Sequence, residues 1–274
     1  MKKRILTAAV CVPLAVVVLS FCPTWVTRAF IAFFCCVGMY ELLSVMKLSR
    51  HRGIVAVAEL FAFAAPSFFY MGDAMWLFAV LIGYAFLLVL IQLLFNQVLK
   101  FERVAYLLCT SVMIIVPIAS LGYLIALPVH GRFYIYLALV IAWLADIGAY
   151  FIGTFFGKHK LCPNISPKKT VEGLCGGLIA AVVFSLVAAV VYQKVCLDPV
   201  GLQVNYWLVA VIALCLSPLS VIGDLLCSVI KRQSGIKDFG KLFPGHGGVL
   251  DRFDSLIFVA PILYILCVYT PIVL

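Results

Sequence analysis

The sequence predicts an all-α polytopic integral membrane protein with about nine transmembrane helices. Of the 274 residues, 66% are apolar and only 11% are charged, and the mean hydropathy is +1.20, a composition that no soluble domain of this length could tolerate on its surface. The apolar runs are about 17 to 24 residues long, enough for a helix to cross roughly 30 Å of hydrocarbon. Strands of a membrane barrel would need only about ten alternating residues each. The connections between the runs alternate between basic and nearly uncharged.

Nine apolar runs are expected to span the membrane. They cover approximately residues 5–22, 26–46, 54–71, 74–95, 107–127, 133–156, 173–192, 205–223 and 255–273. The first run has the basic start and apolar middle of a signal peptide, but no small-x-small cleavage site follows it, and the bulky Phe21 before Cys22 argues against lipoprotein processing. We therefore expect it to be retained as the first helix.

The basic residues predict the orientation of these helices. Of the 20 Lys and Arg residues, 17 fall on one side, and only Arg28, Arg132 and Lys194 fall on the other. The positive-inside rule then places the N-terminus in the cytoplasm and the C-terminus outside. The net charge of +9 is explained by this topology, so nucleic acid is not an expected partner.

The two halves of the chain differ in their polar content. Residues 1–128 are expected to form a scaffold of transmembrane helices, with lipid-side or dimer contacts, and they contain few ionisable groups. Glu41 and Glu59 lie near predicted cytoplasmic helix ends, where each could belong to a site or reach the headgroups or a nearby Arg50 or Arg52. The eleven cysteines lie mostly inside apolar runs without CxxC spacing, which indicates neither a disulfide framework nor a zinc site.

Residues 129–274 are expected to form the catalytic region, with a polar site facing the cytoplasm. Three of its cytoplasmic segments, 145–160, 165–177 and 223–254, are dense in Gly, Pro, Lys and Asp. Eight of the 31 charged residues of the chain lie in residues 228–254 of the last segment, "SVIKRQSGIKDFGKLFPGHGGVLDRFD". A merely solvated linker does not need this mixture of carboxylates, lysines and glycines.

Asp146 lies about ten residues, or roughly 15 Å, from the cytoplasmic end of its predicted helix. An ionised carboxylate at that depth needs a partner such as a metal, a lysine or water in a cavity. Tyr150 follows on the same helix face, and Gly148 and Gly153 permit close approach of a neighbouring helix. The alternative is that Asp146 is simply hydrogen-bonded between helices.

The segment "ISPKKTVEG" has two plausible helix starts, one at Ser166 and Pro167 and one at Thr170. Lys168 and Lys169 would then lie at a helix N-terminus, where free N–H groups and two ammonium groups form an anion site suited to phosphate. Alternatively, the two lysines bind lipid headgroups without specificity.

A further set of polar residues precedes the last apolar run. If the preceding helix continues past the membrane interface, Asp224, Ser228 and Lys231 fall on one of its faces, with Arg232 beside them. A carboxylate, a hydroxyl and a cation in line suit a metal-bound polyphosphate.

A glycine-rich turn containing Gly247 and Gly248 follows, and its backbone amides can approach phosphates closely. Asp251 and Asp254 come next, three residues apart. Carboxylates, cations and glycine amides together are what Mg²⁺ with a nucleoside triphosphate requires. His246 could act as a general base, donate to a phosphate or fix the loop. No GxxxxGK[ST] sequence is present, so this is not a P-loop site.

The pattern S-x-x-K-R, four residues, K-D, five residues, P-x-H-G-G-x-x-D-R-x-D, from Ser228 to Asp254, resembles the signature of the phosphatidate cytidylyltransferase (CDP-diacylglycerol synthase) family. The upstream segments "DIGAYFIG", "FGKHKL", "ISPKKTVEG" and "GDL" are similar to that family as well. The resemblance is strong over residues 140–260, whereas the first half matches only in hydrophobic character.

The resemblance implies a cell-membrane enzyme that converts CTP and phosphatidate into CDP-diacylglycerol and pyrophosphate, with Mg²⁺ and a second, monovalent cation such as K⁺. It makes Asp224 and Asp251 metal-binding carboxylates, with Asp146 and Asp254 as further candidates. It also implies a homodimer. The expected phosphate contacts are Lys168, Lys169, Lys231, Arg232, Lys237 and Arg252, joined by His246, Gly247 and Gly248 of the turn.

One residue departs from the family pattern, and two other functions stay open. The family often carries a glutamate at the position of Cys227, so a carboxylate role there is in doubt. A transporter or channel for an anionic solute would also place charges in membrane helices, although here they cluster on one side. A CTP-dependent enzyme acting on another lipid is the nearer alternative.

Overall fold

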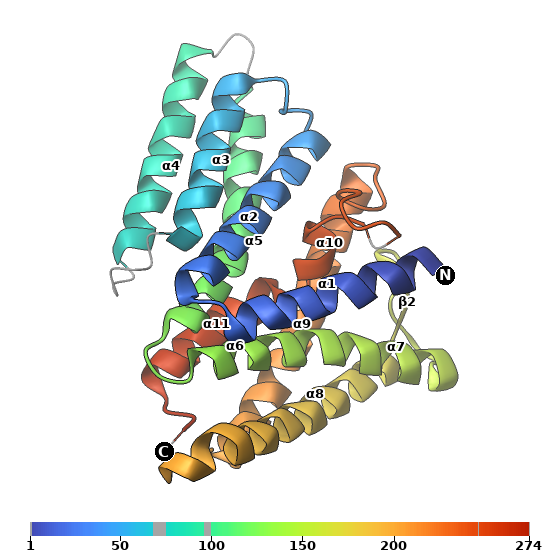
Figure 1. Cartoon of the computed structure of the whole chain (residues 1–274). Helices are drawn as coiled ribbons and strands as arrows, with labels where there is room; N and C mark the ends of the chain where they lie inside the picture. Colours follow the sequence, from blue (N-terminus) through green and yellow to red (C-terminus); the bar gives the residue numbers. More distant parts are fainter. Residues whose placement is uncertain (1, 68–74, 96–99, 246, 274) are drawn as a thin grey trace. The chain divides into compact units, whose positions relative to one another are not determined.

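The computed structural model of the chain describes residues 2–67, 75–95, 100–245 and 247–273, which are mostly helical (Figure 1). The chain divides into two compact units. The first unit comprises Met1–Ala126 and Gln233–Phe253, and the second comprises Leu127–Arg232 and Asp254–Leu274. Residues 233–253, which the sequence assigns to the C-terminal region, thus pack within the first unit.

The first unit is built from six helices of the described residues. They are α1 (Lys2–Phe21), α2 (Thr24–Val45), α3 (Arg52–Ser67), α4 (Met75–Leu94), α5 (Phe101–Ala126) and the short α10 (Leu250–Phe253). Helix α2 packs against both α3 and α5, and α4 covers α3 (Figure 1). The buried face of α2 includes Met39 and Leu43. The ring of Tyr84 stacks on Phe61 with centroids 4.1 Å apart, and its Oη lies 2.9 Å from Ser111 Oγ.

The second unit contains three long helical runs, a hairpin and a shorter apolar helix. Its elements are α6 (Gly131–Leu139), the π-helix η2 (Val140–Leu144), α7 (Ala145–Phe156), β1 (Lys160–Cys162), β2 (Ser166–Thr170), α8 (Val171–Tyr192), the π-helix η3 (Gln193–Leu197), the 3₁₀ turn η4 (Asp198–Val200), α9 (Tyr206–Gln233) and α11 (Leu256–Tyr269). Helices α6, η2 and α7 form one continuous run, because the residues at both junctions keep right-handed helical dihedral angles.

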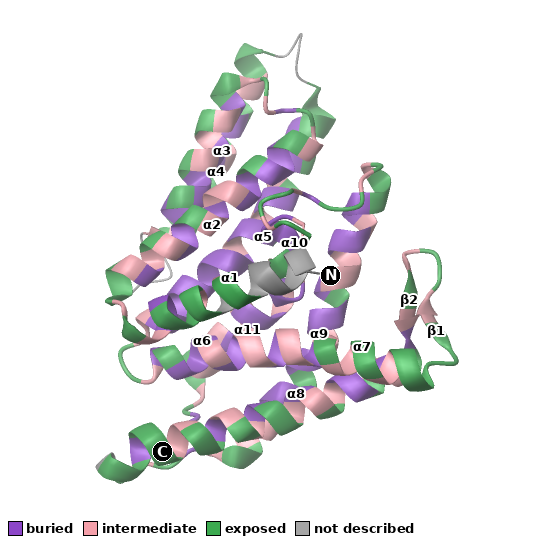
Figure 2. Cartoon of the chain, turned by 45° about the vertical axis from the view of Figure 1, so that its right-hand side comes forward, coloured by how far each residue is buried: buried purple, intermediate pink, exposed green. Residues whose placement is uncertain are grey.

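Helices α7 and α8 lie side by side and approach closely through small residues (Figures 1 and 2). A Cβ atom added at Gly176 would overlap the side chain of Ile152, and one added at Gly148 would overlap Ala180. Small residues allow such approach between membrane helices, where van der Waals packing replaces the hydrophobic effect. The hairpin of β1 and β2 connects these two packed helices.

Six helical segments of the described residues are long and apolar enough to cross a membrane. They are Thr24–Val45, Trp76–Leu94, Phe101–Ala126, Gly131–Phe156, Val171–Leu197 and Tyr206–Gln233. The structure thus agrees with an all-α membrane protein. The other three predicted spans fall on α1, α3 and α11, of which α3 and α11 have only 16 and 14 residues, and residues 68–71 of the third span lie outside the described residues.

Apolar side chains on the outer faces support the membrane assignment. Ile82 of α4 and Ile179 of α8 are 69% and 66% exposed, and exposed residues recur along both helices (Figure 2). Apolar surfaces of this extent are rare on soluble monomers. They are the surfaces that lipid covers.

The contact between α7 and α8 predicts a large effect of volume at Gly176. Replacing Gly176 with Val should destabilise the protein by about 1–3 kcal/mol, because the new side chain overlaps Ile152. The thermal midpoint in detergent should fall accordingly. Gly83→Val is the matched control, since a Cβ at Gly83 meets no atom within 4 Å. Equal midpoints for the two variants would contradict this packing.

Candidate active site

The segment before α8 is a β-hairpin rather than a helix. Strands β1 and β2 pair antiparallel, with Lys160 opposite Thr170. The predicted helix start at Ser166 is therefore wrong, because Ser166–Thr170 is extended. The alternative start at Thr170 is confirmed, since its Oγ1 accepts a hydrogen bond of 3.1 Å from the N–H of Gly173. Lys168 and Lys169 thus lie on the strand leading into the helix.

Glu172, a residue that the sequence reasoning missed, fastens this hairpin to α8. Its carboxylate accepts hydrogen bonds from the backbone N–H groups of Lys158 (3.0 Å) and His159 (3.2 Å). The Nδ1 atom of His159 lies 2.7 Å from Glu172 Oε1. A carboxylate in the first turn of a helix can bind such backbone donors. The sequence "TVEG" could have indicated this role, because its acid lies two positions after the capping threonine, in the first turn of the helix.

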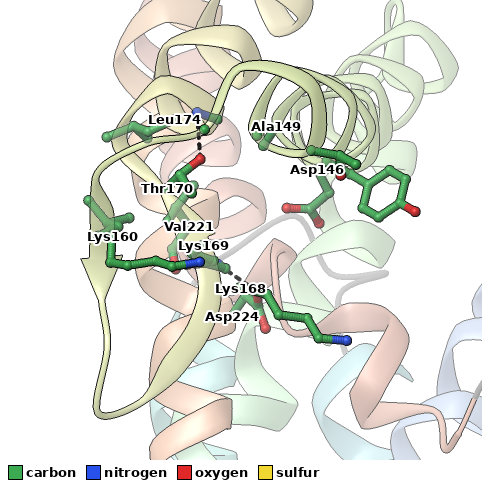
Figure 3. Close-up of a pocket in the computed structure, with 15 residues that line it drawn as sticks. Asp146, Ala149, Lys160, Lys168, Lys169, Thr170, Leu174, Val221 and Asp224 are labelled. Atoms are coloured by element: carbon green, nitrogen blue, oxygen red, sulfur yellow. Dashed lines mark hydrogen bonds and ion pairs between the residues drawn. The ribbon is translucent and has the colours of Figure 1, made fainter.

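The hairpin, α7, the start of α8 and α9 line an open pocket of about 540 Å³ within the second unit (Figure 3). Helix α7 contributes Asp146, the hairpin contributes Lys160, Lys168 and Lys169, and α9 contributes Asp224. Figure 3 shows these side chains gathered around one space. Three cations and two carboxylates therefore face a single cavity.

Lys169 and Asp224 form the closest ion pair of this pocket. Lys169 Nζ lies 2.6 Å from Asp224 Oδ2 and donates a longer hydrogen bond of 3.5 Å to the carbonyl oxygen of Val221. The two side chains are 22% and 26% exposed, so both ends remain accessible from the pocket. Short charge-assisted contacts of this kind are among the stronger hydrogen bonds in proteins.

Helix α9 continues to Gln233, which confirms the prediction that Asp224, Ser228 and Lys231 share one helix. Ser228 and Lys231 are buried, at 9% and 8% exposure. Lys231 Nζ lies 3.8 Å from Oδ2 of Asp254, which lies two residues before α11 begins. Gly223 permits this approach, because a Cβ there would overlap the carbonyl oxygen of Asp254.

The carboxyl group of Asp254 is buried near other charged groups of the second unit. Burial raises the pKa of its carboxyl well above the usual value, and the negative charges of Asp224 and Asp146 raise it further, while Lys231 opposes them. Three carboxylates therefore influence one another in this part of the chain. Such a group is stabilised by added positive charge.

The glycine-rich turn belongs to the first unit. Asp251 is 6% exposed, and its Oδ2 accepts hydrogen bonds from the N–H groups of Phe239 (2.8 Å) and Gly248 (2.9 Å). Gly247 has a φ of +89°, which favours glycine. Lys237 and Arg252 are exposed. His246 lies outside the described residues.

The comparisons with known proteins identify the family. A model of the cytidylyltransferase family matches residues 2–270. The chain belongs to this family. It is 36% identical to a phosphatidate cytidylyltransferase of Bacillus subtilis over 84% of each chain. It is also 35% identical to one of Staphylococcus haemolyticus over 98% of this chain and 99% of that protein. A third, from Staphylococcus epidermidis, is 45% identical over about half of each chain.

The structure of this cytidylyltransferase brings some predicted site residues together. Asp146, Lys168, Lys169 and Asp224 line one pocket, and Ser228, Lys231 and Asp254 belong to the same unit. Lys160 joins the pocket although the sequence reasoning counted it only among the cytoplasmic charges. Lys237, Gly247, Gly248, Asp251 and Arg252 belong to the first unit. Cys227 is buried in α9. Arg232 is exposed near the end of that helix.

The carboxylates of the second unit fit a magnesium ion that shares its ligands with a substrate. Across the described part of the chain, no three His, Cys, Asp or Glu residues form a complete metal cage. Mg²⁺, however, is usually held by one or two carboxylates together with water and substrate phosphates. Asp224, which is electrostatically linked to Asp254 and lines the same pocket as three lysines, has this character.

The hairpin anchor predicts a local effect of changing Glu172. In Glu172→Gln, one carboxylate oxygen becomes an NH₂ group that cannot accept from the Lys158 and His159 amides. Hydrogen exchange at these two amides should become severalfold faster, because a charged acceptor is lost. Glu102→Gln, a change at an exposed helix start in the first unit, serves as the control. Unchanged exchange in Glu172→Gln would show that the carboxylate does not hold the hairpin.

Proposed function

We propose that this protein is a CTP:phosphatidate cytidylyltransferase, which makes CDP-diacylglycerol and pyrophosphate for phospholipid biosynthesis. The observation that carries the proposal is the pocket of the second unit, where Lys160, Lys168 and Lys169 face Asp146 and Asp224 between membrane helices. Charges are costly in such surroundings and usually mark a functional site. The names of the relatives supply the substrates.

The reaction needs charge neutralisation more than proton transfer. Phosphatidate is a phosphomonoester, and its second pKa should lie near 6 by analogy with phosphorylated side chains, so its attacking oxygen is already largely anionic at neutral pH. The remaining difficulty is to bring one phosphate group to the α-phosphorus of another. Fixed cations that hold the two groups in line meet that need.

The proposed roles follow from the chemistry of each side chain. Lys168 is exposed beside the pocket and would contact phosphate oxygens. Lys169 would do so while still paired with Asp224. The positive charge of Lys231 would offset the negative charges of Asp224 and Asp254. The remaining expected phosphate contacts are Arg232, Lys237, Gly247, Gly248 and Arg252, with the hydroxyl of Ser228 on the same helix as Lys231.

A divalent cation is part of the proposal. Asp224 in the second unit and Asp251 in the first are each proposed as Mg²⁺ ligands, and Asp146 and Asp254 are further candidates. The two amide hydrogen bonds to Asp251 Oδ2 would orient that carboxylate. Bound Mg²⁺ would offset the negative charge that develops on the phosphate oxygens. A monovalent cation such as K⁺ is the second ion implied by the family.

The proposed topology follows the distribution of basic residues. Nine crossings, a cytoplasmic N-terminus and an outside C-terminus would place the pocket lysines on the cytoplasmic side, where CTP is made available. The acyl chains of phosphatidate would stay in the bilayer while its headgroup reaches the pocket. A homodimer is expected from the family resemblance.

Transfer of label from α-³²P-CTP into a chloroform-soluble product tests this function. Purified protein in detergent should label lipid only when phosphatidate and Mg²⁺ are both present. Label transfer to a different lipid phosphate or alcohol, with none to phosphatidate, would favour another CTP-dependent enzyme. No transfer to any lipid by folded protein would contradict the proposal and favour transport of an anionic solute.

The same assay tests the assignment of Asp224. Asp224→Asn should lower the rate of label transfer at least about a hundredfold. The variant loses the negative charge that would hold the metal ion at the phosphates. Asp251→Asn is expected to be similarly impaired. Asp198→Asn is the matched control, since Asp198 is exposed and accepts a hydrogen bond from Gln193 away from the pocket. Full activity in folded Asp224→Asn and Asp251→Asn would remove the metal assignment.

A further inference from the structure

Glu41 of α2 makes a contact with residues more than 200 positions later in the chain. Its Oε1 accepts a hydrogen bond of 3.0 Å from the N–H of Val249, and its Oε2 accepts one of 3.1 Å from the N–H of Leu250. The side chain is 7% exposed. Neither Arg50 nor Arg52, the partners considered from the sequence, is needed to explain this carboxylate. Both of its oxygens bind backbone donors of the first unit.

Two glycines of the later segment pack closely against the Glu41 carboxylate. A Cβ atom added at Gly240 or at Gly248 would overlap the Glu41 carboxylate. One turn earlier on α2, a Cβ at Gly38 would lie 2.8 Å from the side chain of Leu250. Glycines at 38, 240 and 248 therefore allow the chain around residues 239–250 to lie directly against α2.

The contact continues to Asp251. The N–H of Gly248, whose Cα faces Glu41, donates to Asp251 Oδ2, and the N–H of Phe239 donates to the same atom. Glu41 thus fixes the backbone at residues 248–250, and this backbone fixes the carboxylate of Asp251. The two acids thus contact both ends of this stretch, whose described residues, 239–245 and 247–251, we call the signature loop.

We propose that Glu41 is a positioning residue that holds the signature loop in the shape required for binding CTP. The proposal rests on the proposed function, because the loop and its flanks carry the expected substrate contacts Lys237, Asp251 and Arg252. Glu41 is not itself one of the expected substrate contacts, although its carboxylate packs against one of them, Gly248. It acts through the backbone of Val249 and Leu250.

The signature loop requires a side chain with two hydrogen-bond acceptor atoms at position 41. Gln has nearly the same shape as Glu, but its NH₂ group is a donor and would face one of the two backbone N–H groups. One of the two hydrogen bonds must be lost, and the neighbouring glycines offer no alternative placement. Asp keeps the charge but is one methylene shorter, so it should restore the contact only in part.

The test compares Glu41→Gln with Glu59→Gln in the purified full-length protein. Glu59 lies on the adjacent helix α3 and is half-buried, and it neighbours Cys36 of α2 rather than a loop residue, so it controls for loss of an internal carboxylate. CTP binding is measured by calorimetry with Mg²⁺ present, and hydrogen exchange is measured at residues 239–251. Binding, unlike turnover, can be measured even if the substrate lipid has been assigned wrongly.

In Glu41→Gln we expect the Kd for CTP to rise about tenfold, the effect of losing one hydrogen bond to a charged group. Exchange at Val249 and Leu250 should also become faster, while Glu59→Gln resembles the wild type in both respects. Gly240→Ala should reproduce the Glu41→Gln result without changing any charge, since its new methyl group displaces the carboxylate. Gly83→Ala is its control.

The outcomes separate this inference from the proposed function. Faster exchange at an unchanged Kd for CTP would overturn the positioning role and leave Glu41 as a structural contact only. Unchanged exchange would overturn the contact itself. Wild-type protein that binds CTP but labels no lipid would instead contradict the proposed function, and the tenfold effect on CTP binding would still support the role of Glu41.

Discussion

Charged side chains in this protein are constrained by the apolar helices that surround them. A buried carboxylate without a partner costs several kcal/mol. The structure meets this constraint in two ways. Asp224 and Asp254 face lysines, at 2.6 and 3.8 Å, whereas Glu41 and Asp251 accept backbone hydrogen bonds. Each of these carboxylates thus has a partner that offsets the cost of its burial.

The ion pairs prepare the second unit for anionic substrates. Lys169 is held by Asp224 and by the carbonyl of Val221, so its ammonium group is already placed at the pocket before any phosphate arrives. Such fixed charges need little reorganisation when the substrate binds, which is the basis of electrostatic catalysis. The hairpin that carries Lys160, Lys168 and Lys169 is in turn held by Glu172. This anchoring contact therefore helps to place the three lysines.

The features that the sequence predicts well are those with a local physical signal. The long apolar runs identify the main helices, and helical spacing correctly places Asp224, Ser228 and Lys231 on a single helix. Thr170 has the chemistry of a helix cap and acts as one. The family signature, which extends over 27 residues from Ser228 to Asp254, identifies the chemistry.

Features that depend on distant contacts could not be predicted in this way. The hairpin at 160–170 has too few residues to show the alternation typical of a strand, and the Ser-Pro pair at its second strand resembles a helix start. The contact of Glu41 joins residues 208 positions apart, and nothing near Glu41 in the sequence indicates it. For the same reason, the sequence gives no sign that residues 233–253 pack with the N-terminal helices.

The central claim is that paired charges of the second unit form one site for the phosphates, and a double-mutant cycle on Lys169 and Asp224 tests it most directly. The rates of CTP-dependent lipid labelling would be measured for Lys169→Met, Asp224→Asn and the double variant. If the two residues act as a unit, the double variant should lose little more activity than the more impaired single variant. Losses that multiply, as for independent residues, would contradict the account.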